Sequence, residues 1–331
     1  MWAPSLLAAS LVAAGPSGCF GTLQYLSMYD YDPAAQAGWL TLGKTDNMTL
    51  LAEGWAKYRI PSLIELSQGA ADSLWCSTNK SLRPCGGRGS ATFAARLVSF
   101  AGAVRPHMKS GACVGVFLGD ELMAADGASW EDLSFVADSL RSVMGPKAIL
   151  YENDAFHQGL IDMPHVPSSL NWFSADGCYG WACPFDSPTG LRTAYEQHIL
   201  PKLAQNQSAF VVPGTYECDS PTMEAPRNSK WRCVPGNSSY DSFIASKVDE
   251  FSAWAKSEPR IAGMCPWHFN NRCLVGGTDF QCGCATPQSA CKAVGAPGTS
   301  AFWQAGAMAM PKTLAKLKAI GHEIQAQAAL A

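Results

Sequence analysis

The stretch that decides the fold is Gly111-Ala-Cys-Val-Gly-Val-Phe-Leu-Gly-Asp-Glu121, an apolar run that ends in two adjacent carboxylates. An apolar run of this length, bounded by glycine, is typical of a strand buried on both faces, and such strands form parallel sheets covered by helices. Strict alternation predicts two opposite faces along this strand: Val114, Val116 and Leu118 on the first, and Gly115, Phe117, Gly119 and Glu121 on the second. Glu121 is therefore predicted to end the strand and to face the interior of a barrel.

Working outward, seven further segments have the composition of strands, and helical patterns separate most of them. The predicted strands are residues 20–30, 38–43, 59–66, 147–151, 170–175, 208–212 and 260–269. The predicted helices are residues 48–58, which Asp46 would cap, 90–108, a helix after the N-cap Ser129, 189–205, 240–257 and 300–328. The segment after residue 151 is predicted to have a short return helix or none, and residues 67–89 and 270–298, rich in Gly, Ser and Cys, are predicted as loop insertions.

Eight strands that alternate with helices in one continuous chain, with no linker composition, predict a single domain. The expected fold class is α/β, a (β/α)8 TIM barrel with disulfide-bonded loop insertions that spans residues 19–331. A chain of 331 residues is long enough for such a barrel, which takes about 250 residues. We expect it to be a monomer.

The first residues indicate secretion. Residues 1–14 are a short apolar stretch that ends in small residues, and we interpret residues 1–18 as a signal peptide, too short to span a bilayer. The chain has 13 cysteines, of which three pairs bracket loops, as local disulfides do in an oxidising compartment: Cys76 and Cys85, Cys178 and Cys183, and Cys218 and Cys233. Twelve cysteines are predicted to pair, and Cys113, in the middle of a strand, is predicted to stay free. Four Asn-x-Ser/Thr sequons, at Asn47, Asn79, Asn206 and Asn237, are compatible with this route.

Composition and missing motifs exclude several classes of function. The net charge is −3 and Lys and Arg do not cluster, so neither nucleic acid nor an anionic membrane is an expected partner. No His-x-His or His-Glu-x-x-His motif, phosphate loop or Gly-x-Ser-x-Gly motif occurs, and we expect no metal and no cofactor. The cysteines of residues 273–291 lack the paired spacing of a zinc site, and disulfides are the favoured interpretation.

Two glutamates follow predicted strands at positions that suit hydrolysis of a glycosidic bond. Glu121 follows the fourth predicted strand and Glu217 the seventh. Such a bond breaks through an oxocarbenium-like state, which needs one acid to protonate the leaving oxygen and one carboxylate to attack the sugar carbon. Pro213 can end the seventh strand early, so Glu152 and Asp176 are alternatives for the second carboxylate.

With these two glutamates in place, the chain resembles the clan A glycoside hydrolases. These are retaining (β/α)8 enzymes whose acid/base Glu follows strand four and whose nucleophile Glu follows strand seven. The resemblance implies that Glu121 is the acid/base and Glu217 the nucleophile, with a β-linked glucan or related polysaccharide as substrate. The chain departs from the pattern at Asp120, because these enzymes usually have Asn before the acid/base.

A ring of polar and aromatic residues at the predicted strand ends completes the candidate site. The substrate-binding candidates are Asp30, Glu65, Asp120, Asn153, Asp176, Tyr179, Trp181, Tyr216, Trp267 and His268. Aromatic faces stack on the C–H groups of sugars, and the polar groups bind hydroxyls. Trp267 resembles the Trp that floors the sugar subsite in clan A enzymes. The alternative is a secreted barrel that binds carbohydrate without cleaving it.

Overall fold

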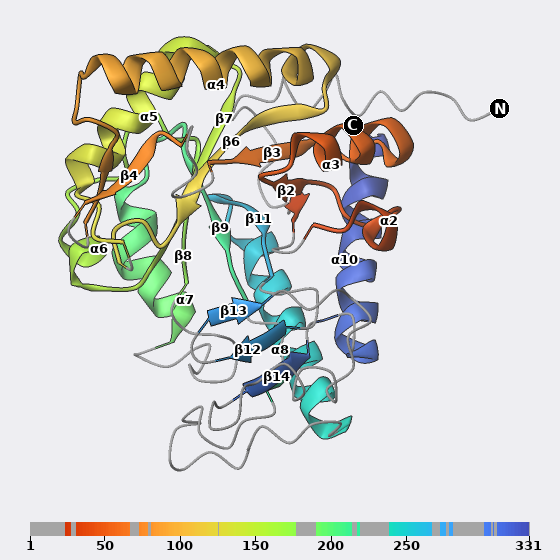
Figure 1. The fold of residues 1–331 in the computed structure, drawn as a ribbon. Coiled ribbons are helices and arrows are strands. Elements are labelled where there is room, and N and C mark those ends of the chain that lie inside the picture. The colour runs from red at the N-terminus through yellow and green to blue at the C-terminus, as the bar shows by residue number, and fades with distance from the viewer. Residues whose placement is uncertain are drawn as a thin grey trace.

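A computed structural model of the chain describes residues 24–27, 31–66, 73–78, 81–124, 126–176, 190–213, 217–218, 238–266, 272–275, 278–280, 301–305, 307 and 310–330. Its main element is a sheet of eight parallel strands, in the order β1-β11-β9-β8-β7-β6-β3-β2 (Figure 1). Their bounds are β1 Tyr25–Leu26, β2 Gly43–Thr45, β3 Ser62–Glu65, β6 Cys113–Asp120, β7 Ile149–Ala155, β8 Trp172–Asp176, β9 Ser208–Val211 and β11 Ile261–Met264. This order confirms the predicted α/β class and the parallel pairing of the eight strands.

The sheet curls until its two edges meet. The backbone N–H groups of Thr41 and Leu42, just before β2, donate to the carbonyl oxygen of Leu26 in β1 at 3.1 and 3.2 Å. The curled sheet encloses a core to which all eight strands or their ends contribute: Tyr25, Leu42, Leu63, Val114, Phe117, Tyr151, Trp172, Phe210, Val212, Ala262 and Cys265. Aromatic rings fill much of it, and the ring centroids of Trp172 and Phe210 lie 4.7 Å apart. The interior is therefore packed with side chains rather than open.

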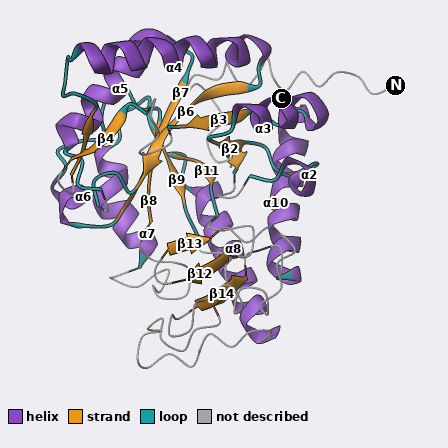
Figure 2. Cartoon of the chain, in the orientation of Figure 1, coloured by secondary structure: helices purple, strands orange, loops and turns teal. Residues whose placement is uncertain are grey.

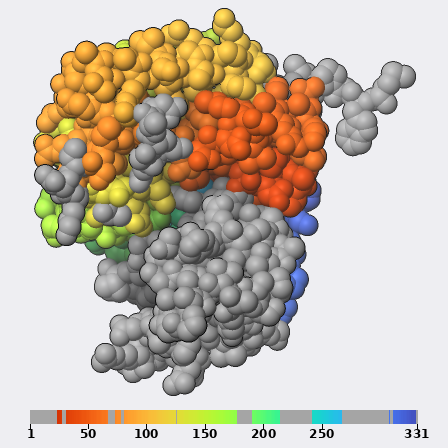
Figure 3. Space-filling view, viewed as in Figure 1, coloured from red at the N-terminus to blue at the C-terminus, as the bar shows by residue number. Residues whose placement is uncertain are grey.

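Helices cover the outside of the sheet (Figure 2). They are α2 (Pro33–Gln36), α3 (Met48–Glu53), η1 (Gly54–Tyr58), α4 (Ala91–Ser110), α5 (Trp130–Met144), α6 (Gln158–Asp162), α7 (Leu191–Ala194), η2 (Tyr195–Ile199), η3 (Leu200–Lys202), α8 (Ser238–Ser257) and α10 (Pro311–Leu330). Their apolar residues pack on the outward-facing residues of the strands, among them Val116 and Leu118 of β6. On the face shown in Figure 3, residues 31–66 lie beside α4, and both segments line one small cavity.

Most of the predicted boundaries agree with the structure, and the capping residues explain where helices begin. Ser129 accepts the N–H of Asp132 and starts α5, as predicted. Asp46 was the wrong cap for α3, since Asn47 accepts the N–H groups of Thr49 and Leu50. The predicted strand 38–43 was also misplaced, because β2 is residues 43–45. The short α6 after β7 confirms the predicted short return helix.

The first insertion was wrongly predicted to be a loop throughout. Residues 75–78 (β4) and 81–84 (β5) form an antiparallel hairpin, joined by the predicted disulfide between Cys76 and Cys85. The buried indole of Trp75 donates to the carbonyl oxygen of Leu118 in β6 at 3.1 Å. The hairpin is thereby anchored on the strand that leads to the candidate site.

A second sheet of four antiparallel strands, which the sequence did not predict, consists of segments that follow β9 and β11. Its order is β10-β14-β12-β13, with β10 Glu217–Cys218, β12 Arg272–Val275, β13 Thr278–Phe280 and β14 Ala301–Ala305. The predicted helix 300–328 therefore began too early, because residues 301–305 pair with β10 and β12. α10 begins at Pro311, a residue that suits the first turn of a helix. The carboxylate of Asp241 in α8 accepts the N–H groups of Lys312 and Thr313 and caps α10.

The prediction that Cys113 stays free is confirmed, but the prediction that the other twelve cysteines all pair is wrong. Cys113 is buried and free as expected, but Cys265 is also buried and free, so twelve cysteines cannot pair. The predicted pairs Cys178–Cys183 and Cys218–Cys233 and the predicted signal peptide lie outside the residues whose side chains are described. Within the described ranges, none of the helices combines the length and the hydropathy needed to cross a bilayer.

Candidate active site

Two irregularities in β6 decide which of its side chains face the interior. Phe117 pairs with Tyr151 of β7, but the next pair is Asp120 with Asn153, so three steps in β6 match two in β7. This is a β-bulge, and its Gly119 has φ +154°, a conformation that favours glycine. The extra residue places Asp120, rather than Glu121, on the same face as Phe117. The predicted alternation is wrong at this point.

A second bulge lies at the start of the same strand. Ser62 pairs with Cys113 and Leu63 pairs with Gly115, which leaves Val114 as the extra residue. Val114 belongs to the interior core, although alternation assigned it to the helix-facing side. Val116 and Leu118 lie on the helix-facing side and Phe117 in the interior, as predicted.

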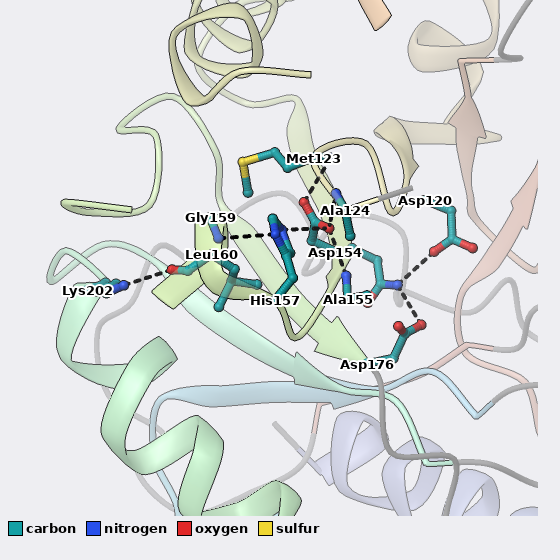
Figure 4. Close-up of polar contacts among 11 residues, drawn as sticks. Asp120, Met123, Ala124, Asp154, Ala155, His157, Gly159, Leu160, Asp176 and Lys202 are labelled. Atoms are coloured by element: carbon teal, nitrogen blue, oxygen red, sulfur yellow. Dashed lines mark hydrogen bonds and ion pairs between the residues drawn. The ribbon is translucent and has the colours of Figure 1, made fainter. Parts of the chain in front are cut away.

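One amide joins the acids at the carboxyl ends of β6 and β8. The Asn153 side chain, in β7 between them, donates from Nδ2 to Asp120 at 2.7 Å and to Asp176 at 2.9 Å (Figure 4). A nitrogen that donates both of its hydrogens holds the two acceptor oxygens about 5 Å apart. Asn153 is completely buried and Asp176 nearly so, so this polar group lies largely out of contact with water.

The amide of Asn153 is held in turn by hydroxyl groups beneath it. Ser174 of β8 donates to Asn153 Oδ1, and the Tyr151 hydroxyl lies 2.7 Å from Ser174 Oγ. All three residues are buried. The chain of hydrogen bonds from Tyr151 to the acids is therefore part of the packed interior.

Burial raises the pKa of Asp176 to about 8, and the nearby charges of Asp120 and Glu121 add to this effect, while the hydrogen bond from Asn153 opposes it. The Glu121 carboxyl lies close enough to Asp176 to take part in a hydrogen bond with it. Asp176 is consequently protonated at neutral pH in the folded protein. A carboxylic acid that keeps its proton at this pH, next to other carboxylates, is a group suited to proton transfer.

Glu121 has an unusual backbone conformation. Its φ is +52°, one of two positive φ values among the described non-glycine residues, and its N–H donates to the carbonyl oxygen of Asn153 at 2.8 Å. Such a conformation costs on the order of 1 kcal/mol and persists only where the surroundings enforce it. The turn directs the Glu121 carboxyl toward Asp176, although Glu121 is not on the interior face of β6.

The turn that carries Glu121 is fastened from the opposite face of β7. Asp154 is buried there, and its carboxylate accepts the N–H groups of Met123, Ala124 and Ala155 (Figure 4). Burial raises its pKa to about 7, an effect that these three hydrogen bonds oppose. His157 Nδ1 accepts the N–H of Gly159, so the ring proton is on Nε2, which faces Asp154 at 3.6 Å. Burial lowers the pKa of His157.

Glu152 does not join the acid cluster, although it was an alternative for the second carboxylate. It pairs with Phe173 on the helix-facing side of β7 and is completely buried, and among the described residues neither of its carboxyl oxygens has a hydrogen-bond partner. Burial raises its pKa well above the ordinary range, and Asp154, Asp120 and Asp176 raise it further. Glu152 is therefore a neutral acid behind the site.

A cation faces the interior from β2. Lys44 is buried, lies 3.7 Å from Glu65 of β3 and sits 4.0 Å from the centroid of the Phe117 ring. Cys265 directly follows β11, and burial raises the pKa of its thiol to about 12. Glu65, a predicted substrate-binding residue, also lines the cavity of about 190 Å³ beside α4, which does not include the acid cluster.

The structure brings four of the predicted site residues together: Asp120, Glu121, Asn153 and Asp176. The backbone of Glu217 is in β10 of the second sheet. Six predicted residues lie outside the described residues: Asp30, Tyr179, Trp181, Tyr216, Trp267 and His268. The sequence analysis missed Lys44, Tyr151 and Ser174. A charged residue inside a core strand would have drawn attention to Lys44, but the predicted strand ended at residue 43 and so left Lys44 out. No group of three metal-binding side chains occurs in the part of the chain that is described.

No protein-family model and no curated protein sequence matches this chain. Among solved structures, the chain is similar to a chitinase from Rhizomucor miehei, with 13% identity and a TM-score of 0.43 over 74% of this chain and 95% of that chain. It is similar to xylanase B from Clostridium stercorarium F9, with 9% identity and a TM-score of 0.46 over 75% and 86%. It is also similar to a β-glucuronidase from Parabacteroides merdae, with 12% identity and a TM-score of 0.43. That match covers 70% of this chain and 27% of that enzyme. All three are glycoside hydrolases by name.

Proposed function

We propose that this protein is a glycoside hydrolase that cleaves a polysaccharide, with a β-linked glucan as the expected class of substrate and with retention of configuration. The observation that carries the proposal is the cluster of Asp120, Glu121 and Asp176 around the Asn153 amide. The cluster lies at the carboxyl ends of neighbouring strands in a curled parallel sheet, where barrel enzymes hold their catalytic groups. The reaction needs one carboxyl that gives a proton and one carboxylate that attacks, and this cluster supplies several carboxyl groups at one place.

In the proposed reaction, Glu121 protonates the glycosidic oxygen and a second carboxylate attacks the anomeric carbon. The sugar–oxygen bond breaks, and a covalent glycosyl-enzyme forms. Glu121 then takes a proton from water, which attacks the same carbon and releases the sugar. We assign the attacking role to Glu217. Asp120 is the competing candidate, because it directly precedes Glu121 and the Asn153 amide fixes its carboxyl on the interior face of β6.

The remaining assignments extend this proposal. Glu65, together with Asp30, Tyr179, Trp181, Tyr216, Trp267 and His268, is proposed to line the sugar subsites, and Asn153 is proposed to serve substrate binding through the two acids that it holds. The protein is proposed to be a secreted monomer. The disulfide between Cys76 and Cys85 supports an oxidising compartment.

The first test is incubation of the purified protein with a panel of polysaccharides, followed by assay of new reducing ends. Release from at least one β-linked polymer is the expected result. Binding to a polymer without release would favour a carbohydrate-binding protein instead, and neither binding nor release across the panel would contradict both functions.

Substitutions then separate the two acids by role. Glu121→Gln should slow hydrolysis of polysaccharides by about 10²-fold or more, because they need a proton on the leaving oxygen. Activated aryl glycosides should still form the intermediate, and azide should restore their turnover. Glu217→Gln should abolish both steps. If Glu217→Gln is active and Asp120→Asn is not, the attacking carboxylate is Asp120.

A further inference from the structure

We propose that Asp176 stores the proton that Glu121 delivers, and that the buried chain Tyr151–Ser174–Asn153 is the positioning device that holds the Asp176 side chain beside Glu121. The inference rests on the proposed function, because it names the source of the catalytic proton in that reaction. Asp176 accepts a hydrogen bond from Asn153, and Glu121 is a neighbour whose carboxyl raises the pKa of Asp176.

The direction of the chain follows from the chemistry of its members. The amide oxygen of Asn153 can only accept, so the Ser174 hydroxyl uses its single hydrogen to donate to it. Ser174 Oγ must then accept from the Tyr151 hydroxyl, 2.7 Å away. The Asn153 amide is thereby prevented from flipping, and its two hydrogens are committed to Asp120 and Asp176. Since every member is buried, water does not compete for these bonds.

The position of the proton follows from the same contacts. Asp176 Oδ2 accepts from Asn153, whereas the buried Oδ1 has no donor among the described residues. An oxygen in that position is the one that carries the proton, because a buried carboxylate oxygen without a donor is costly.

The charges around Asp176 come from several elements. Asp120 and Glu121, from β6 and the turn after it, both raise the pKa of Asp176, and Glu152 of β7 interacts with its charge from behind the sheet. Tyr195 of η2 also feels that charge. Lys44, the one buried cation among the described residues, lies 3.7 Å from Glu65. These surroundings favour the neutral form of Asp176.

Proton transfer balances over the cycle. Glu121 gives a proton to the leaving oxygen and takes the proton of Asp176, which becomes a carboxylate. When water attacks the glycosyl-enzyme, Glu121 gives its proton back to Asp176 and takes a proton from the water, so both acids end the cycle as they began it. Asp176 does not need to touch the substrate, so it acts through Glu121.

The activity test is the pH profile of kcat on the polysaccharide that the panel identifies. The parent should lose activity on the alkaline side near pH 8, the pKa of Asp176. In Asp176→Asn the alkaline limb of the profile, where kcat falls, should move toward the ordinary pKa of a glutamate, about 4.3. Activity should then fall by about 10²-fold at pH 7 but much less at pH 5. Ser174→Ala should move the alkaline limb a smaller distance in the opposite direction, to higher pH, because the freed Asn153 amide gives up a hydrogen bond that favours the Asp176 carboxylate.

A matched control is Ser139→Ala. The Ser139 hydroxyl donates to the carbonyl oxygen of Phe135 within α5, away from the strands, so this variant loses one hydroxyl with no route to Asp176. Its pH profile should equal that of the parent. A purely structural role for Ser174 would lower kcat without moving the limb, and an unmoved limb in Asp176→Asn would overturn the proposal.

Infrared titration tests the same assignment without activity. The parent should show a carboxylic-acid carbonyl band that disappears around pH 8, and Asp176→Asn should lack it. Glu152→Gln should remove a different band that persists to higher pH. If the band assigned to Asp176 is present but no substrate is cleaved, the proton assignment stands and the hydrolase proposal fails. If substrate is cleaved but the band survives in Asp176→Asn, the stored proton belongs to another group and this inference is wrong.

Discussion

Gly119 controls the bulge that turns Asp120 toward the interior, and its replacement by alanine is a direct test of that geometry. The residue has φ +154°, and a Cβ there would lie 2.4 Å from Cδ2 and 2.9 Å from Cγ of Leu122. Leu122 is completely buried, so it has little room to move away. Backbone strain of about 1–3 kcal/mol and overpacking of similar size should act together, and we expect a loss of roughly 3 kcal/mol or more.

Two other glycines separate these contributions. Gly38→Ala combines φ +85° with no atom within 4 Å of the new Cβ, so it should cost only the backbone strain, about 1 kcal/mol. Gly102→Ala is inside α4, also with no atom within 4 Å, and should stabilise by up to about 1 kcal/mol. Urea unfolding at fixed pH measures all three free energies of unfolding. Activity should fall in Gly119→Ala more than in Gly38→Ala, because only the first displaces Asp120.

The outcome that would refute this reasoning is a free energy of unfolding for Gly119→Ala within about 0.5 kcal/mol of the parent, the range of an ordinary surface substitution. The bulge would then tolerate a side chain, and glycine would not be the reason that Asp120 faces the interior. A loss equal to that of Gly38→Ala would mean that Leu122 moves aside and that backbone strain is the whole effect.

Two further predictions concern titration and thiols. Glu152 stays neutral in the folded protein but ionises above about pH 4.3 in the unfolded chain, so it lowers the free energy of unfolding as pH rises. Glu152→Gln should therefore gain stability over the parent between about pH 5 and pH 8. Urea unfolding should show a gain of up to about 1.4 kcal/mol per pH unit. A constant difference between the two proteins at every pH would show that Glu152 is ionised when folded. Cys113 and Cys265 are free, and the other 11 of the 13 cysteines are an odd number, so at least one more thiol must stay unpaired in a monomer. Thiol titration of unfolded, unreduced protein should therefore find at least three thiols. A single thiol would contradict the free state of Cys265.

Much of the fold was predictable because it depends on local patterns. The apolar run at 111–121, the caps of helices and the spacing of apolar residues predicted eight parallel strands and most of the helices. Boundaries failed where partners distant in sequence decide the structure. Residues 301–305 form a strand because β10 and β12 bind them, and no local signal in an Ala- and Trp-containing segment distinguishes that from the start of a helix.

The sequence by itself determined which acids end the strands: Asp120 and Glu121 after an apolar run, and Asp176 after another. Only the tertiary structure decided how they are arranged. Side chains alternate along a strand until a bulge inserts a residue, and a bulge is a property of the pairing between two strands, which one strand does not reveal. For the same reason, Ser174 and Tyr151 carried no signal in the sequence. Their roles arise because parallel strands bring residues 151, 153 and 174 into hydrogen-bonding distance inside a buried interior, where an amide must satisfy both of its ends.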